Sequence, residues 1–150
     1  MTIKISAEVF DPYQEIQAYQ NARLAHTGAV GATSIFIGTM RDFNEGVAVK
    51  GMTLEYYPGM TENQLEKIIS EAQQQWRFID SLVIHRVGDI LPNESIVLVA
   101  VWSTHRGDAF DASRYMMEAL KSKAPFWKKE LLVTENERWV EHNTNGYKSG

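Results

Sequence analysis

The spacing of apolar residues changes repeatedly along this chain, and this change constrains the fold more than any other feature. Apolar side chains alternate from Ile3 to Val9, as in a strand, and recur every three or four residues from Leu65 to Trp76, as on one helical face. Both patterns return over 150 residues with no internal repeat or low-complexity segment. The sequence therefore predicts one domain of mixed helices and strands, long enough to bury a sizeable core.

Capping signals at two places predict where helices begin. Asp11-Pro12 combines a common N-cap with a proline suited to the first helical position, and Gln14 is placed to close a capping box. We therefore expect a helix that ends near residue 24. Thr61 and Gln64 form a second candidate capping box, which is followed by apolar residues on one helical face.

A third helix is expected to begin near Gly107. Pro125 prevents its continuation, because proline lacks the backbone N–H that an interior helical position donates. The side chains that this helix is expected to bury are those of Phe110, Met116, Met117 and Leu120.

Strands are expected between and after these helices. The connection through Pro92-Asn93 is short, which favours antiparallel pairing of the strands before and after it. The polar segment 41–46 ends in glycine and is expected to be a loop. The expected strands cover residues 3–9, 35–37, 54–57, 81–87, 95–102, 128–133 and 138–140, the last two as a hairpin.

Composition excludes several classes of function. Fifteen Lys and Arg residues against nineteen Asp and Glu residues give a net charge of −4, which argues against broad nucleic-acid binding because that affinity depends on neutralising many phosphates. The chain has no cysteine, so it has neither a disulfide nor a thiolate metal site nor a persulfide of its own. We expect no signal peptide and no membrane-spanning segment, and therefore a cytoplasmic protein.

Positive charge is concentrated in one short segment, Ser103 to Glu130, of this acidic chain. Its members are His105, Arg106, Arg114, Lys121, Lys123, Lys128 and Lys129. His105 and Arg106 fall where a strand ends and a helix starts, and free helical N–H groups there favour a phosphate. The alternative is a helix-start histidine beside a solvated arginine.

Lys121 and Lys128 flank an apolar corner, Ala124 to Trp127, and could converge. A lysine beside another cation and an apolar wall loses proton affinity, so it can act as a nucleophile or general base near neutral pH. Arg41, in another loop, could close the same pocket. The alternative is ordinary, because lysines also favour helix ends and strand edges.

The histidines carry weaker signals. His85 repeats the His-Arg pair at a strand end, but no helix follows it, so we interpret it as a hydrogen-bonded structural residue without a catalytic role. No metal is expected, because the four histidines lack the close spacing of a metal site; they are His26, His85, His105 and His142.

Five motifs in this order resemble the large, catalytic subunit of molybdopterin synthase, the MoaE family. They are G-A-T-S-I-F-I-G-T-M-R-D-F-N-E-G at 31–46, L-E-Y-Y-P-G-M at 54–60, V-I-H-R-V-G at 83–88, V-A-V-W-S-T-H-R at 99–106 and L-K-S-K-A-P-F-W-K-K-E at 120–130. The resemblance covers about residues 28–140. It departs from the family at Met40, where valine is usual, and at Asn93, where glycine is usual.

The resemblance implies an α+β fold of the α/β hammerhead type with an antiparallel β subdomain, in a single domain over residues 1–150. It also implies a reaction, in which two sulfurs are inserted into cyclic pyranopterin monophosphate to form the dithiolene of molybdopterin. The sulfur would arrive as a thiocarboxylate on the C-terminal glycine of a small ubiquitin-like subunit, MoaD. A homodimer of the large subunit would form the core of a heterotetramer, with no cofactor.

The resemblance also implies roles for individual residues. Lys121 and Lys128 would be catalytic, and the substrate's phosphate would be held by Arg41, His105 and Arg106. The pocket would be lined by Thr39, Met40, Lys129 and Glu130. In the family a basic tail residue can join the anion pocket, but the tail here, residues 141–150, begins with Glu141, His142 and Asn143, so that contribution stays unassigned.

A different class of function is also compatible with the basic segment. A non-enzymatic module could bind a phosphorylated small molecule or a partner's C-terminal tail through positive charge alone. Such a module would tolerate exchange of lysine for arginine, whereas a lysine that transfers a proton or attacks a carbonyl would not.

Overall fold

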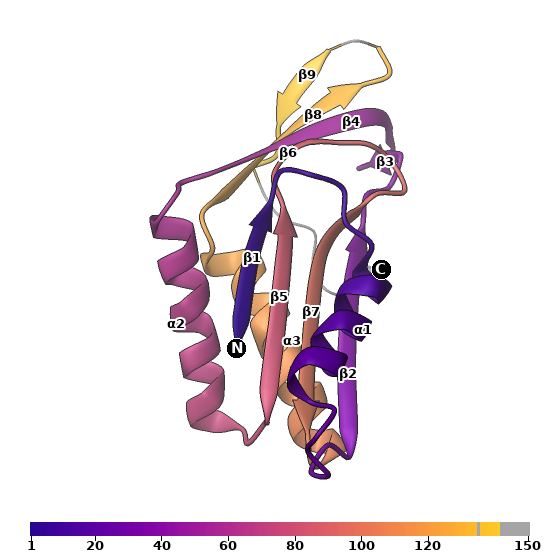
Figure 1. The fold of residues 1–150 in the computed structure, drawn as a ribbon. Coiled ribbons are helices and arrows are strands. Elements are labelled where there is room, and N and C mark those ends of the chain that lie inside the picture. The colour runs from indigo at the N-terminus through magenta and orange to yellow at the C-terminus, as the bar shows by residue number, and fades with distance from the viewer. Residues whose placement is uncertain (135, 142–150) are drawn as a thin grey trace.

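The computed structural model describes residues 1–134 and 136–141, and within them the chain forms three helices and nine strands (Figure 1). The helices are α1 (Pro12–Arg23), α2 (Met60–Gln75) and α3 (Arg106–Lys123). The strands are β1 (Thr2–Ser6), β2 (Ala32–Thr39), β3 (Phe43–Asn44), β4 (Val47–Tyr56), β5 (Asp80–Arg86), β6 (Gly88–Ile90), β7 (Ser95–Ser103), β8 (Phe126–Leu132) and β9 (Glu137–Trp139). The predicted α+β class is confirmed.

A four-stranded sheet in the order β1-β5-β7-β2 forms the body of the domain. The expected antiparallel pairing of β5 with β7 is confirmed, and β2 pairs antiparallel with β7, whereas β1 runs parallel to β5. Alternate residues point to opposite faces of a sheet. Val83 and Val99 accordingly pack with α2 and α3, while Leu82 and Ala100 pack with α1 on the other face. Figure 1 shows this sheet between its helices.

A second sheet crosses the end of the first, at the top of Figure 1. Its path is β3-β4-β8-β9, and β6 also pairs with β4. The expected hairpin of β8 and β9 is confirmed. The segment expected to be a loop contains the short strand β3, joined to β4 by Glu45 and Gly46, whose φ angles of 52° and 74° suit a tight hairpin turn.

The start of α2 that the sequence predicts is wrong. Its N-cap is Gly59, with φ at 85°, and the backbone N–H of Gly59 donates to the Glu62 carboxylate at 2.8 Å. Thr61 is fully buried and does not cap the helix. Its hydroxyl accepts from the Tyr57 N–H at 3.1 Å and donates to the Pro125 carbonyl at 3.2 Å. The predicted Thr61–Gln64 box is therefore replaced by a tie between the start of α2 and the corner after α3.

The other helix ends are close to prediction. The Asp11 carboxylate caps α1 by accepting from the Tyr13 N–H at 2.9 Å. Helix α3 ends before Pro125 and buries Met116, Met117 and Leu120 as expected. Phe110 is 63% exposed, so the expectation that it is buried is wrong. No helix in the part of the chain described here is long and apolar enough to cross a membrane.

Candidate active site

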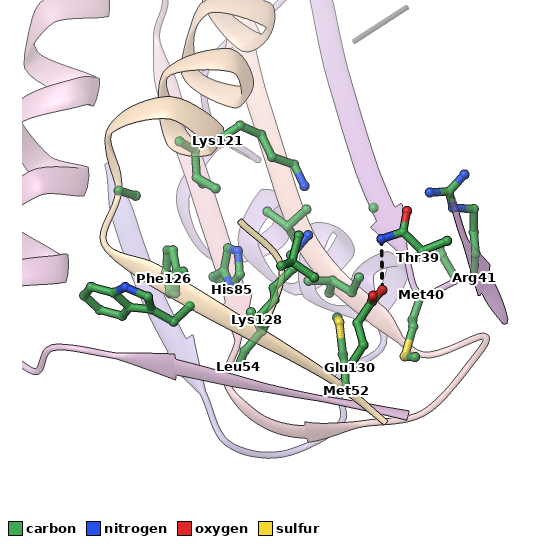
Figure 2. Close-up of a pocket in the computed structure, with 18 of the residues that line it drawn as sticks. Thr39, Met40, Arg41, Met52, Leu54, His85, Lys121, Phe126, Lys128 and Glu130 are labelled. Atoms are coloured by element: carbon green, nitrogen blue, oxygen red, sulfur yellow. Dashed lines mark hydrogen bonds between the residues drawn. The ribbon is translucent and has the colours of Figure 1, made fainter. Parts of the chain in front are cut away.

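A cavity of about 340 Å³ lies where the two sheets meet, beside the C-terminal end of α3. Seven elements contribute residues to its wall: the end of β2, β3, β4, β5, the start of β7, the last turn of α3, and β8 (Figure 2). The wall includes Phe36, Thr39, Met40, Arg41, Asn44, Met52, Leu54, His85, Lys121, Phe126, Trp127, Lys128, Glu130 and Glu141.

Lys121 and Lys128 are brought together, as the sequence analysis expected. Helix α3 ends at Lys123, and Pro125 turns the chain into β8, so the last helical turn faces the first residues of that strand. The pKa of Lys128 is lowered from 10.5 to about 8, first by burial and then by the charge of Lys121 and a hydrogen bond to it. Lys128 is therefore partly an amine near neutral pH, which is the form that attacks or accepts protons.

Glu130 supplies negative charge behind the lysines. It is 6% exposed and accepts from Arg138 Nε at 2.7 Å and from Asn44 Nδ2 at 3.0 Å. Arg138 also donates to the Asn44 carbonyl at 3.0 Å, so one network joins β3, β8 and β9. The charge of Glu130 acts to raise the pKa of Lys128 and thereby limits the fall caused by burial.

Arg41 follows the end of β2 and adds a third cation to the cavity. Its guanidinium lies 5.0 Å from the centre of the Phe43 ring, and its charge also lowers the pKa of Lys128. Thr39 and Met40 line the cavity beside it, and Met40 is buried in the apolar core of the second sheet. The arrangement suits a small anionic ligand held beside a reactive amine.

Three residues expected at the site do not line this cavity. His105 is the N-cap of α3 and Arg106 its first residue, whereas Lys121 lies in its last turn. At about 1.5 Å per residue, the rise along the helix separates the two ends by more than about 20 Å. Lys129 points to the face of β8 opposite Lys128, where it pairs with Glu137 at 3.6 Å and lies 5.4 Å from the Trp139 ring centre.

Three residues of the site were missed by sequence reasoning. Asn44 and Arg138 hold Glu130, but they are distant in the chain, and the pairing of β3, β4, β8 and β9 in one sheet brings them together. His85 lines the cavity, although its position at a strand end predicts a structural residue without a catalytic role. The alternation of β5 is a signal that could have placed it, because His85 shares a face with Val83, which packs under α2 and α3.

Glu141 also lines the cavity, while His142 and Asn143 lie outside the described residues. Within residues 1–134 and 136–141, no group of three or more His, Cys, Asp or Glu residues is placed to hold a metal ion.

The fold and cavity define an α+β protein with a lysine pair placed for chemistry on a small anionic ligand. The chain belongs to the MoaE family: the model of the MoaE protein matches residues 6–123.

Known proteins are similar to this chain in sequence and structure along most of its length. The molybdopterin synthase catalytic subunit of Ralstonia nicotianae is 50% identical over 140 residues, which is 93% of this chain and 77% of the relative. The structure of a molybdopterin biosynthesis MoaE protein from Burkholderia ambifaria is 45% identical, with a TM-score of 0.78 over 97% of this chain and 92% of that one. The crystal structure of molybdopterin synthase from Staphylococcus aureus is 30% identical, with a TM-score of 0.81 over 93% of this chain and 96% of that one.

Proposed function

We propose that this chain is the catalytic subunit of a molybdopterin synthase, a sulfurtransferase of molybdenum cofactor biosynthesis. It converts cyclic pyranopterin monophosphate to molybdopterin by inserting two sulfurs as a dithiolene. The observation that carries the proposal is Lys128, with its pKa lowered to about 8, beside Lys121 in a cavity that also holds Arg41. Relatives named as molybdopterin synthase catalytic subunits support it.

The sulfur must come from another chain, because this one has no cysteine to carry it. We propose that a small ubiquitin-like subunit delivers it as a thiocarboxylate on a C-terminal glycine tail. The segment from Lys128 to Val133 is a plausible edge for such a tail from its sequence, but this prediction is wrong, because β8 pairs with β4 on one side and β9 on the other. The tail instead enters the cavity, where Trp127, 41% exposed, lies in the wall.

Lys121 and Lys128 then lie beside the thiocarboxylate. They can stabilise the negative charge that develops on it, or one amine can attack its carbonyl carbon. Arg41 holds the anionic end of the pterin, and Thr39, Met40 and Glu130 form the wall around it. Lys129 is not part of the proposed site, since it faces away.

We propose that His105 and Arg106 reach this site from a second copy of the chain. Within one copy they lie at the far end of α3, so they cannot hold a ligand beside Lys121. A homodimer supplies them from the partner. Two features support this assembly: β2 is an edge strand, and Ile35, Phe36 and Phe110 carry side chains that are 45%, 43% and 63% exposed.

We further propose that residues 1–150 form one catalytic domain, that no metal or other cofactor takes part in the reaction, and that the protein works in the cytoplasm. The tail, residues 141–150, keeps no assigned role, and residues 142–150 of it lie outside the described part of the chain.

The test is reconstitution with the thiocarboxylated small subunit and cyclic pyranopterin monophosphate. We expect dithiolene formation that depends on both chains and on the last two residues of the small subunit. Stable binding of the pterin without any dithiolene would instead identify a non-enzymatic binding module. Sustained conversion by this chain with inorganic sulfide, at the rate of the complete complex, would contradict delivery by a tail.

A further inference from the structure

His85 is a buried polar residue in the cavity wall, and the proposed reaction so far assigns it no role. It lies at the end of β5, is 5% exposed, and packs face to face on Phe126 with ring centres 3.9 Å apart and planes 12° apart. Phe126 and Lys128 point to the same face of β8. Figure 2 accordingly shows His85 between Phe126 and Lys128.

The hydrogen bond of His85 fixes its tautomer. Nδ1 lies 2.8 Å from the backbone carbonyl oxygen of Arg86. A carbonyl only accepts, so Nδ1 carries the proton and Nε2 of the neutral ring has a free lone pair. Burial lowers the pKa of His85 to about 4, and the charges of Lys121 and Lys128 act in the same direction. The ring is therefore neutral at the pH at which the lysines react.

The other charged groups around Lys128 are Lys121, Arg41 and Glu130. Lys121 at the end of α3 and Arg41 after β2 are cations. Glu130 on β8 is an anionic acceptor; its oxygens accept from Asn44 and Arg138, and its charge raises the pKa of Lys128. Nε2 of His85 is an acceptor of a different kind, because it carries a lone pair without a negative charge.

We propose that His85 is a positioning residue for the sulfur-transfer reaction: its Nε2 accepts a hydrogen bond from the Lys128 side chain and directs the lysine nitrogen toward the thiocarboxylate. The inference rests on the proposed function. The bond forms on rotation about the outer torsions of Lys128, and catalytic hydrogen bonds often close only when substrate is bound. Because an ammonium donates more strongly than an amine, the bond also holds the pKa of Lys128 above the value that an apolar wall would give.

Two substitutions separate the acceptor from the packing of the ring. His85→Phe keeps the aromatic stack on Phe126 and removes Nε2, whereas His85→Gln places an amide oxygen near the position of Nε2. In the complete complex, we expect His85→Phe to lower kcat by about ten- to a hundredfold, the scale of one hydrogen bond to a charged group. KM for the pterin should change less than about twofold, and the acidic limb of the kcat profile should move to lower pH. His85→Gln should restore both kcat and the profile.

His85→Asn covers the case in which the phenylalanine variant does not fold. Its amide still donates to the Arg86 carbonyl but does not reach Lys128, so it should behave as His85→Phe. A folded His85→Phe or His85→Asn variant with wild-type kcat and pH profile would overturn the proposal. So would a His85→Gln variant as defective as the other two, since the ring would then act through packing alone.

A measurement that does not require turnover distinguishes failure of this inference from failure of the proposed function. Carbon-13 at Cε of lysine reports the pKa of Lys128 by NMR titration in the complex with the small subunit. His85→Phe should lower that pKa by about half a unit to one unit, and His85→Gln should leave it near the wild-type value. An unchanged pKa in His85→Phe contradicts the role of His85 even where no dithiolene forms. A lowered pKa in a complex that makes no dithiolene supports the contact and contradicts the proposed function.

Discussion

At the scale of single residues, the lysine pair decides whether the cavity performs chemistry or only binding. Lys121 and Lys128 share the cavity with Arg41, and the pKa of Lys128 falls to about 8 because burial and the neighbouring charges disfavour its ammonium form. A residue that only neutralises a phosphate gains nothing from this loss of proton affinity. A nucleophile or base gains the free lone pair.

Removing either lysine should abolish most of the activity. We expect Lys121→Ala and Lys128→Ala each to lower turnover by at least about a hundredfold, the usual scale for a lost acid-base or covalent group. Lys123→Ala is the matched control, since Lys123 pairs with Glu71 at 3.5 Å on the surface and does not line the cavity. Dithiolene assays of the complete complex measure the effect. Near-normal synthesis by Lys128→Arg would leave these lysines an electrostatic role only.

Lys128 should also lower the stability of the folded protein. The pKa of Lys128 is about 8 in the folded chain against 10.5 ordinarily, so between these pH values the unfolded chain binds more protons and stability rises with pH. Below that window the folded chain holds a buried cation beside Lys121. Lys128→Met should therefore raise the free energy of unfolding at neutral pH by about 1–3 kcal/mol while activity is lost.

Urea unfolding at neutral pH and near pH 10 measures the change in the free energy of unfolding that Lys128→Met causes. The gain of Lys128→Met should shrink at the higher pH, where the folded wild-type lysine has already lost its charge. An equal gain at both pH values would attribute the stabilisation to packing instead of charge.

At the scale of elements, the corner after α3 sets the distance between the lysines. Thr61 joins the start of α2 to this corner through its hydrogen bonds to Tyr57 and Pro125. Thr61→Val keeps the shape but leaves the partly buried Tyr57 N–H and Pro125 carbonyl without this partner. We expect a loss of about 1–3 kcal/mol in the free energy of unfolding, measured with denaturant, and a reduced kcat as the corner loosens.

Thr104→Val is the control for this substitution, because Thr104 is exposed and lies at the opposite end of α3. If Thr61→Val were as stable as the wild type and fully active, the tie would have no part in holding the corner.

The elements that could be predicted from sequence are those whose signals are local. Asp11 caps α1 because proline and the carboxylate are adjacent in the chain, and the Pro92-Asn93 turn pairs β5 with β7. Thr61 misleads because its partner, Pro125, is distant in sequence. Phe110 misleads in a different way, since a helical period shows which residues share a face but not whether a second molecule covers that face.

At the site too, residues with local signals could be predicted from the sequence, and residues that depend on long-range contacts could not. Lys121 and Lys128 could be predicted because one short corner joins them, and Arg41 because its loop breaks an apolar strand. His105 and Arg106 are close to the lysines in sequence but at the other end of a rigid helix, so proximity in the chain was misleading. Glu130 depends on Asn44 and Arg138, a contact that arises from strand pairing and has no local signal.

At the scale of the whole molecule, the position of His105 and Arg106 predicts sites shared between two copies. Lys128→Ala and the double substitution His105→Ala with Arg106→Ala should each be poorly active alone. When equal amounts of the two variants are unfolded and refolded together, half of the dimers are mixed, and each mixed dimer has one intact site. We therefore expect about a quarter of wild-type turnover in the mixture.

Activity in the mixture no higher than that of the separate variants would contradict a shared site, provided that light scattering shows a dimer. A wild-type chain that is a monomer at assay concentration, with full activity in the complex, would contradict the dimer itself.

The pairing of β4 with β8 also determines when the cavity can form. Met52 and Leu54 on β4 lie opposite Glu130 and Lys128 on β8, which the ribosome adds much later. Contacts between distant parts of a chain form slowly, because the entropy of a long loop is lost before any contact compensates for it. A nascent chain that has reached only β7 therefore carries β4 with one edge unpaired and its apolar side chains uncovered. Synthesis, more than any later stage, is when we expect this protein to depend on chaperones.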